Sequence, residues 1–372
     1  MIFPFKKGNG DPETKNVSIY RSILNQKFWL DAAYNEIAMN TTMKAIVTEK
    51  KGEVFLKDVV VPEIAAGALL IETKCSLISP GTELHYIHHA EDETLLGYCA
   101  AGTVLEVGEG VTGFSAGDRV IAMGWSYAIH AERIVVPYKL CVRIPDAVPF
   151  EEAVFANLAA TSLHAIHRAL IKEEDKVLII GGGLVGQLLA QLVKKMVSSV
   201  FLHDTDPGRT AIAKQCNIDV IEADLYFATS FKNYFTKIFL CLSGDATSTF
   251  GLCQQLLSKS EDGHLRGRIV CVGRFRANLN FDVSLGNIDL VIASRCGTGY
   301  KDKNFEFGKK DYAAPEGEET VSNNLKECLG RIGRKELNVS RLITDTLSFY
   351  KGPSAYPLFH KHPRSLGVIL EY

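Results

Sequence analysis

The rhythm of apolar and polar positions changes near residue 175, and this change divides most of the chain into two kinds of structure. Before it, short apolar runs rich in β-branched residues alternate with Gly and Pro, a pattern typical of strands and turns. These runs span 44–47, 54–60, 69–77, 102–120, 134–136 and 140–144, and 102–120 reads as two strands joined by a glycine-rich turn. After it, apolar runs at 177–180, 200–204, 238–242 and 268–272 alternate with helical patterns at 184–196, 208–215 and 247–257. The alternation predicts a parallel sheet with right-handed crossovers.

The flanking segments complete the predicted organisation. A helix is expected to start at Glu151, because Val154, Leu158, Leu163 and Ile166 follow helical spacing. A helix at 322–330 and a strand at 365–372 close the chain, and we expect that strand to return to the first region. The expected order is an N-terminal extension (1–42), a mostly-β domain (43–157), an α/β domain (158–297) and a return segment (298–372).

Residues 1–42 do not share this regular pattern. Residues 1–16 are polar and rich in Gly, Pro, Lys and Asp, a composition typical of disorder. Residues 18–38 would suit an amphipathic helix and lack the continuous apolar core of a signal peptide. We interpret the extension as an appendage or the product of an upstream start, with a docking helix as the alternative.

Composition and charge narrow the class of protein. The chain has 372 residues, of which 47% are hydrophobic and 23% charged, as expected for an ordinary two-domain globular protein. A net charge of −2 gives no electrostatic reason to expect binding to nucleic acid or to an anionic membrane. The most apolar run, 177–193, is explained by a strand and a helix rather than by a membrane span. Nine scattered cysteines without a C-x-x-C pair indicate reduced thiols in a cytoplasmic protein.

The glycine loop at 181–186 carries the clearest candidate chemistry. Gly181, Gly183 and Gly186 supply G-x-G-x-x-G spacing between an apolar strand and the start of a helix. They allow, in turn, a sharp bend, a close approach of a pyrophosphate and tight packing of the helix on the strand. The next strand ends in Asp204, at about the distance expected for a ribose contact. The spacing predicts a dinucleotide site; a glycine-rich turn that binds nothing is the alternative.

Further segments match one known family. They are Met43–Ala45, Gly81–His85, Gly102–Val120, Gly267–Gly273, Leu342–Thr344 and Leu366–Leu370. With the glycine loop and Asp204, they make the chain from Met43 to Tyr372 resemble the medium-chain dehydrogenase/reductase superfamily. The resemblance implies an α/β fold, in which a Rossmann doubly wound parallel sheet joins a GroES-like, mostly-β catalytic domain. It also implies an alcohol dehydrogenase-like oxidoreductase and a homodimer paired through the strand near 289–293.

The chain departs from the zinc-dependent members of that superfamily at the metal ligands. Their cysteine falls at Ser79, their His-Glu pair at Tyr98 and Cys99, and their last ligand near Asn157. Zinc takes thiolate, imidazole or carboxylate ligands, so this set predicts that no metal is bound. The lobe with four closely spaced cysteines is also missing. The chain therefore resembles the zinc-independent branch, and its segment 79–83 is similar to that of bacteriochlorophyllide-type alcohol dehydrogenases.

Without zinc, side chains must manage the proton of the reaction. Thr82 and His85 align with the hydroxyl and imidazole that pass the alcohol proton to solvent in zinc-dependent members, and both groups can donate and accept. The alternatives are a threonine that caps a turn and a surface histidine. Tyr98 is the third candidate, as a proton donor to a carbonyl oxygen; otherwise its ring fills the space left by the metal.

The cofactor contacts follow from the loop and from the resemblance. A carboxylate at Asp204 accepts hydrogen bonds from ribose hydroxyls and repels a 2′-phosphate, so we predict NAD. NADP stays possible because His203 and Arg209 are close in sequence, and Asp204 has an alternative role as a helix cap. The candidate cofactor-binding residues are Thr161, Gly181, Gly183, Leu184, Val185, Gly186, Asp204, Arg209, Ser243 and Gly273.

Three functions are compatible with this reading. We favour a zinc-independent, NAD-dependent dehydrogenase that acts on a small secondary alcohol or its ketone. The first alternative is an NADPH-dependent reductase of enones or quinones. The carboxylate of Asp204 argues against it, because it would repel the 2′-phosphate of NADPH. The second is a catalytically silent nucleotide-binding protein, suggested by the loss of the zinc ligands.

Overall fold

The computed structural model describes residues 42–49, 52–222, 229–361 and 365–372 of the chain. The predicted extension at 1–42 lies outside these residues, apart from Thr42. Residues 44–57 and 62–372 form one compact unit. That unit combines a mostly-β domain with a parallel sheet covered by helices, which is the α/β class expected from the sequence. No helix in the described ranges is long and apolar enough to cross a membrane.

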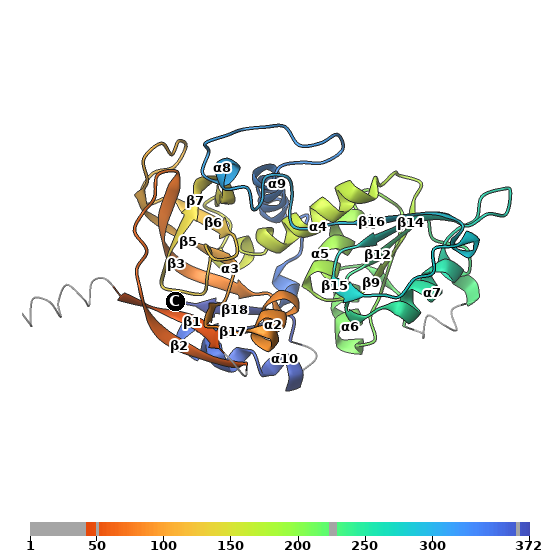
Figure 1. Ribbon diagram of the computed structural model, residues 1–372, viewed down its shortest axis with the longest axis horizontal. Helices are drawn as coiled ribbons and strands as arrows, with labels where there is room; N and C mark the ends of the chain where they lie inside the picture. The colour runs from red at the N-terminus through yellow and green to blue at the C-terminus, as the bar shows by residue number, and fades with distance from the viewer. Residues whose placement is uncertain (1–41, 50–51, 223–228, 362–364) are drawn as a thin grey trace, which may run out of the picture. The chain divides into compact units, whose positions relative to one another are not determined.

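The mostly-β domain is built on a seven-stranded sheet in the order β17-β18-β3-β5-β6-β8, with β7 also paired to β3. Figure 1 shows β18, in blue, beside β3, in orange, and the two strands pair antiparallel. The last strand of the chain, β18, therefore completes a sheet that begins with β3, early in the mostly-β region. The strands are β3 (Ala68–Ile78), β5 (Cys99–Val107), β6 (Arg119–Met123), β7 (Arg133–Pro137), β8 (Cys141–Arg143), β17 (Ile343–Ser348) and β18 (Gly367–Glu371).

A small second sheet and one helix complete the part of this domain that matters for the site. The sheet has the order β2-β1-β4, with β1 at Thr42–Glu49, β2 at Glu53–Val60 and β4 at Thr94–Leu95. Helix α2 (Pro80–His89) follows β3 directly, with Pro80 in its first turn, where a missing N–H costs nothing. The pattern had not predicted this helix, because its apolar positions are few and Pro-Gly opens it.

The second domain is a six-stranded sheet in the order β11-β10-β9-β12-β14-β16, and every neighbouring pair is parallel. The strand order reverses between β9 and β12, which is where doubly wound sheets bind nucleotides at their carboxyl ends. The strands are β9 (Lys176–Ile180), β10 (Ser199–His203), β11 (Asp219–Val220), β12 (Lys237–Leu240), β14 (Arg266–Cys271) and β16 (Asn287–Ile292). The connecting helices are α5 (Leu184–Val193), α6 (Pro207–Gln215) and α7 (Thr247–Leu256).

The core of this sheet explains why its strands read as continuous apolar runs. Leu178 in β9, Ile238 in β12 and Ile269 in β14 are fully buried, and Phe235 and Phe250 pack against the same cluster. A parallel sheet is covered on both faces, so its strands lack the alternation of a half-exposed sheet.

The single helix predicted from Glu151 is wrong in one respect. The structure has a short helix, α3 (Phe150–Ala153), and then a separate helix, α4 (Ala156–Ala169). The apolar residues at the junction, Val154 and Phe155, are fully buried, so tertiary packing outweighs the continuous helical period there.

The remaining elements lie outside the two large sheets. A two-stranded parallel pair joins β13 (Ser243–Asp245) to β15 (Arg274–Arg276). The segment 301–319 contains a short helix, α8 (Lys303–Glu306). The other elements are α9 (Val321–Gly333), α10 (Leu358–Lys361) and the 3₁₀ turns Tyr138–Leu140, Thr229–Phe231, Val283–Leu285, Ser340–Leu342 and Phe349–Ala355.

Candidate active site

The glycine loop has the backbone geometry that a dinucleotide site requires. Gly181 has φ +108°, and a Cβ there would lie 2.4 Å from the carbonyl oxygen of Cys241. A Cβ on Gly186 would lie 1.9 Å from the carbonyl oxygen of Gly181, so helix and strand meet too closely for a side chain. A Cβ on Gly183 would meet nothing within 4 Å, so the side on which a pyrophosphate would pass is open. The three glycines therefore fit a bound dinucleotide.

The start of α5 offers its backbone N–H groups to the same open side. Gly183 is the N-cap and has no side chain to accept from them, and Leu184 and Val185 form the first turn. Such N–H groups and the helix dipole favour phosphate oxygens. Helix α4 is held at this point, because Ser162 Oγ donates to the carbonyl oxygen of Val185 at 3.0 Å. Thr161, the preceding residue, is partly exposed beside this contact.

Asp204 braces the glycine loop from the end of β10. Its Oδ2 accepts from the Gly182 N–H at 2.7 Å and its Oδ1 from the Asp206 N–H at 2.8 Å. Arg209 Nη1 lies 3.4 Å from the same carboxylate. The helix cap considered for Asp204 is supplied instead by Asp206, which accepts from two N–H groups at the start of α6. Asp204 and Arg209 thus stand together beside the loop.

Ser243 and Gly273 follow β12 and β14, at the same carboxyl edge of the sheet as the glycine loop. Both residues are exposed. A Cβ on Gly273 would lie 2.0 Å from the carbonyl oxygen of Leu242, so the two chain segments pass each other closely. The candidate cofactor residues therefore come from the ends of neighbouring strands, as in other doubly wound sheets.

Three side chains at or near the family's metal position are hydrogen-bonded to one another. Tyr98 OH donates to Ser79 Oγ at 2.6 Å, and Thr82 Oγ1 lies 3.5 Å from the same phenol oxygen. Burial, more than any nearby charge, raises the pKa of Tyr98 well above its usual range. The phenol is therefore neutral across the physiological range and acts as a hydrogen-bond donor.

His85 lies on the same helix as Thr82, and residues three apart share one face of a helix. Its ring is partly exposed and stacks on the ring of His89 at a centroid distance of 4.3 Å. Desolvation and then the charge of Arg274 lower the pKa of His85 below its ordinary value of 6.5. Among the described residues no hydrogen bond joins Thr82 to His85, so the two side chains lie on one helix without forming a relay.

Of the side chains that the resemblance matches to metal ligands, Ser79, Tyr98 and Asn157 are not among the usual ligands of zinc. Burial raises the pKa of Cys99 well above its usual range, so without a metal beside it this residue is a thiol. Asn157 Nδ2 donates to the Ala122 carbonyl oxygen at 3.1 Å, and its buried Oδ1 has no partner among the described atoms. Among the residues that the structure describes, no three His, Cys, Asp or Glu side chains are grouped as a metal would require.

A buried pair that the sequence had not singled out lies directly behind Ser79. Glu83 and His130 are fully buried, with His130 Nε2 3.0 Å from Glu83 Oε2. The same carboxylate accepts from Tyr356 OH at 2.6 Å and from the Ser79 N–H at 2.7 Å. His130 Nδ1 lies 2.8 Å from Ser76 Oγ. Glu83 therefore fixes the backbone that carries Ser79, the acceptor of the Tyr98 hydroxyl.

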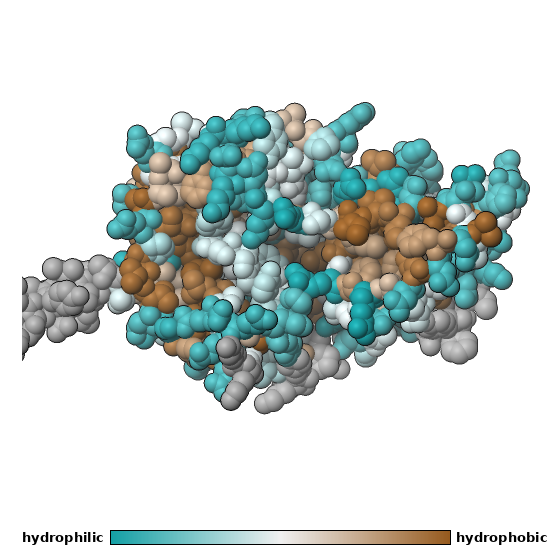
Figure 2. Space-filling model, viewed as in Figure 1, coloured by the Kyte–Doolittle hydropathy of each residue, from teal (hydrophilic) through white to brown (hydrophobic). Residues whose placement is uncertain are grey.

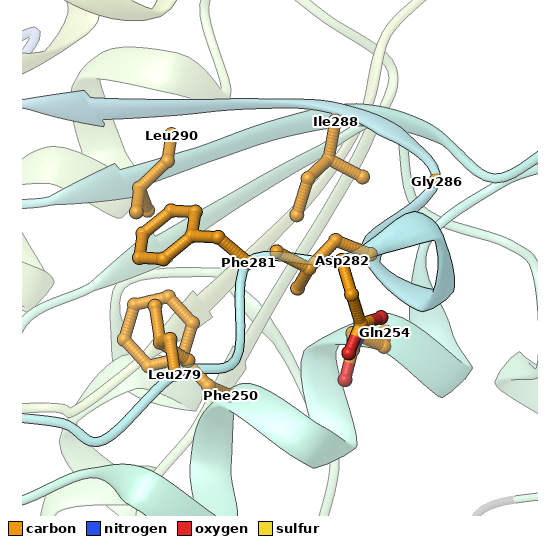
Figure 3. A pocket seen from close by; sticks show the side chains of 9 residues that line it. Phe250, Gln254, Leu279, Phe281, Asp282, Gly286, Ile288 and Leu290 are labelled. Carbon is orange, nitrogen blue, oxygen red and sulfur yellow. The ribbon is translucent and has the colours of Figure 1, made fainter.

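An apolar pocket of about 270 Å³ lies away from these residues, at the β16 edge of the parallel sheet. Figure 3 shows Phe250, Phe281, Ile288 and Leu290 around it. Figure 2 shows hydrophobic surface gathered over the β14–β16 region of the same domain. Phe281 and Ile292 are 79% and 67% exposed, which is unusual for large apolar residues. This face suits contact with another protein surface better than it suits catalysis.

Comparison with known protein families finds one match. Residues 65–146 match the alcohol dehydrogenase GroES-like domain. This range covers most of the seven-stranded sheet, with helix α2 and the buried pair.

Comparison with individual proteins extends the likeness over the second domain. A zinc-type alcohol dehydrogenase-like protein of Escherichia coli, YphC, is 28% identical over 219 residues, which are 48% of this chain and 62% of that protein. The match thus spans less than two thirds of that relative. Galactitol-1-phosphate dehydrogenase from Escherichia coli superposes with a TM-score of 0.71 at 20% identity, over 89% of this chain and all of that one. A dehydrogenase of Escherichia coli CFT073 solved with NADH superposes with a TM-score of 0.68 at 18% identity, over the same shares.

Proposed function

We infer that this chain is a member of the medium-chain dehydrogenase/reductase superfamily, because residues 65–146 match the alcohol dehydrogenase GroES-like domain, and on that premise we propose its activity. We propose that it transfers hydride between a nicotinamide cofactor and a small secondary alcohol or ketone, without zinc. The observation that carries the zinc-free part is the hydrogen bond from Tyr98 to Ser79, because both stand where zinc-dependent members hold metal ligands. YphC is described as zinc-type, so the proposed absence of zinc distinguishes this chain from that relative.

NAD is the cofactor that the glycine loop favours. When bound, it supplies the hydride, and the protein orients the substrate and manages one proton. The open side of Gly183 and the N–H groups of Leu184 and Val185 would receive the pyrophosphate. Asp204 is 8% exposed as a side chain and would accept hydrogen bonds from the ribose hydroxyls, a role in which it would repel a 2′-phosphate.

The proton of the reaction is handled by groups on α2 and by Tyr98. In ketone reduction, the carbonyl carbon gains the hydride and the π electrons move to oxygen, which then needs one proton. Tyr98 donates a hydrogen bond to that oxygen in place of its bond to Ser79, and its raised pKa keeps it from giving up the proton. Thr82 supplies the proton. His85, which lies on the same helix but makes no hydrogen bond to Thr82, returns a proton to it through water, since its lowered pKa keeps the imidazole mostly neutral and able to exchange protons with solvent at pH 7.

We also propose that two copies of the chain pair through β16, in the cytoplasm. The strand is an edge of the parallel sheet, and Ile292, Phe281 and Val283 are strongly exposed around it. All nine cysteines are free, which suits a reducing compartment. Light scattering tests the assembly: a dimer is expected, and an Ile292→Asp variant that remains dimeric would place the interface elsewhere.

The proposed function is tested by fluorescence titration of metal-stripped protein with NADH and with NADPH, followed by a panel of alcohols and ketones. We expect tighter binding of NADH and turnover of at least one secondary alcohol or ketone. Tighter binding of NADPH with turnover of enones would favour the reductase instead. Binding of neither nucleotide would leave a protein with the fold but without the function.

A further inference from the structure

Arg274 brings a cation from the nucleotide-binding domain to the candidate catalytic helix. It is the first residue of β15 and directly follows Gly273, at the carboxyl edge of the parallel sheet. Its guanidinium carbon lies 5.7 Å from the ring centroid of Tyr86, on helix α2. Tyr86 is the neighbour of His85, so the cation stands next to the groups that would handle the proton.

The charge of Arg274 is not neutralised within the described part of the chain. Arg276, two residues later on the same strand, pairs with Asp245 at 3.3 Å. Arg209 and Arg268 have carboxylate partners as well. Arg274 is exposed, and within the described residues its guanidinium contacts the ring of Tyr86 and pairs with no carboxylate. Its charge reaches His85, where it adds to desolvation in lowering the pKa of that imidazole.

Aromatic rings beside Arg274 form an aromatic shelf, which consists of Tyr86, Tyr98 and Trp125. The rings of Tyr86 and Trp125 stack at a centroid distance of 4.0 Å, and the ring of Tyr98 lies 6.2 Å from that of Trp125. The backbone of Trp125 is held, because its N–H donates to Tyr300 OH at 3.1 Å. All three residues of the shelf are partly exposed. The shelf therefore places partly exposed aromatic side chains beside Arg274 and includes the candidate catalytic Tyr98.

We propose that the substrate pairs a planar, unsaturated body with an anionic group, which is a carboxylate or a phosphate. The planar body lies on the aromatic shelf, and the anionic group binds the guanidinium of Arg274. A guanidinium forms two parallel hydrogen bonds to such an oxyanion, and aromatic faces favour planar groups. The proposal rests on the proposed function, because it places this substrate at the Tyr98 hydroxyl and adds what the reacting alcohol or ketone must carry.

Calorimetric titration with benzoate, phenyl phosphate and benzamide tests the anionic requirement without turnover. The protein is titrated both free and saturated with NAD⁺, so that anion binding is read even if no nucleotide binds. We expect benzoate or phenyl phosphate to bind about tenfold more tightly than benzamide, as one charge-assisted contact at a partly exposed site allows. Whichever anion binds better identifies the group.

Two variants assign that preference to a residue. Arg274→Met keeps the apolar stem and is expected to remove the preference for anions, whereas Arg276→Met is expected to retain it. Equal binding of benzamide and both anions by the unaltered protein would overturn the proposal. So would an unchanged preference in Arg274→Met. If Arg274→Met instead weakens NAD⁺ while anion preference persists, the guanidinium serves the cofactor and the proposal is also overturned. Failure of the proposed function would appear separately, as the absence of nucleotide binding and turnover.

Discussion

Replacing Asp204 by Asn removes the charge beside the glycine loop with little change in shape, so it isolates what the carboxylate does for cofactor choice. In the structure, one carboxylate oxygen accepts from the Gly182 N–H and the other from the Asp206 N–H. Asparagine keeps only one of these bonds, because its amide nitrogen is a donor. The variant therefore loosens the loop for both nucleotides alike.

The ratio of the two affinities cancels that shared loss. A hydrogen bond from a ribose hydroxyl to the Asp204 carboxylate contributes about 1.5–3 kcal/mol, and every 1.4 kcal/mol is roughly tenfold in affinity. The side chain is only 8% exposed, so solvent screens the charge weakly. NADPH loses a repulsion in the variant, whereas NADH loses an attraction. We therefore expect the preference for NADH over NADPH to fall by about tenfold or more.

Fluorescence titration with each reduced nucleotide measures this ratio. Asp206→Asn is the matched control, because Asp206 caps α6 through the Gly208 and Arg209 N–H groups and asparagine caps a helix about equally well. Its ratio should match that of the unaltered protein. An unchanged ratio in Asp204→Asn, or an equal change in both variants, would refute the reasoning.

Three further predictions follow from the loop, the buried pair and the histidine. Gly183→Val should abolish NADH binding with little change in the melting temperature, since the added Cβ points into open space. Gly186→Ala should instead lower the melting temperature, because its Cβ would lie 1.9 Å from a carbonyl oxygen. NADH binding by Gly183→Val would disprove the assignment of the loop. Glu83→Ala should lower the free energy of unfolding by about 3–5 kcal/mol, or the melting temperature by roughly 4–6 °C for a chain of this length, because His130 and Tyr356 lose their buried carboxylate partner. Glu327→Ala, at a surface ion pair, should change the melting temperature little. Equal shifts in the two variants would contradict the burial argument. Because burial lowers the pKa of His85, its imidazole stays neutral at pH values below 6.5. The pH profile of the rate of alcohol oxidation should therefore fall on the acid side with a midpoint below 6.5, and this fall should vanish in His85→Gln. If it survives in that variant, another group causes it.

The parts of the site that depend on local chain geometry could be predicted from the sequence. The glycine loop is one example, because its spacing, its strand and its helix are all contiguous, and the structure has the sharp turn at Gly181 and the close helix–strand approach at Gly186. The candidate cofactor residues Ser243 and Gly273 also follow from strand order, since parallel strands end at one edge of the sheet. Their roles in binding remain predictions.

The parts that depend on long-range packing could not be predicted. Glu83 meets His130 across 47 positions and Tyr356 across 273, and no local pattern links them. A buried acid in the first turn of a helix is visible in sequence only once the helix is known, and α2 itself lacks a helical pattern. The contact between Arg274 and Tyr86 joins two domains, so only the folded chain brings the cation to the aromatic shelf.

In the proposed function, Tyr98 and Ser79 take the place of the metal of a zinc-dependent dehydrogenase. The most direct test measures the turnover of a secondary alcohol or ketone by chelator-treated protein, with its zinc content determined by mass spectrometry. We predict full activity without zinc, no gain when zinc is restored, and a large loss of the maximal rate in Tyr98→Phe with unchanged NADH affinity. Activity that appears only as one zinc ion per chain is restored would contradict the account.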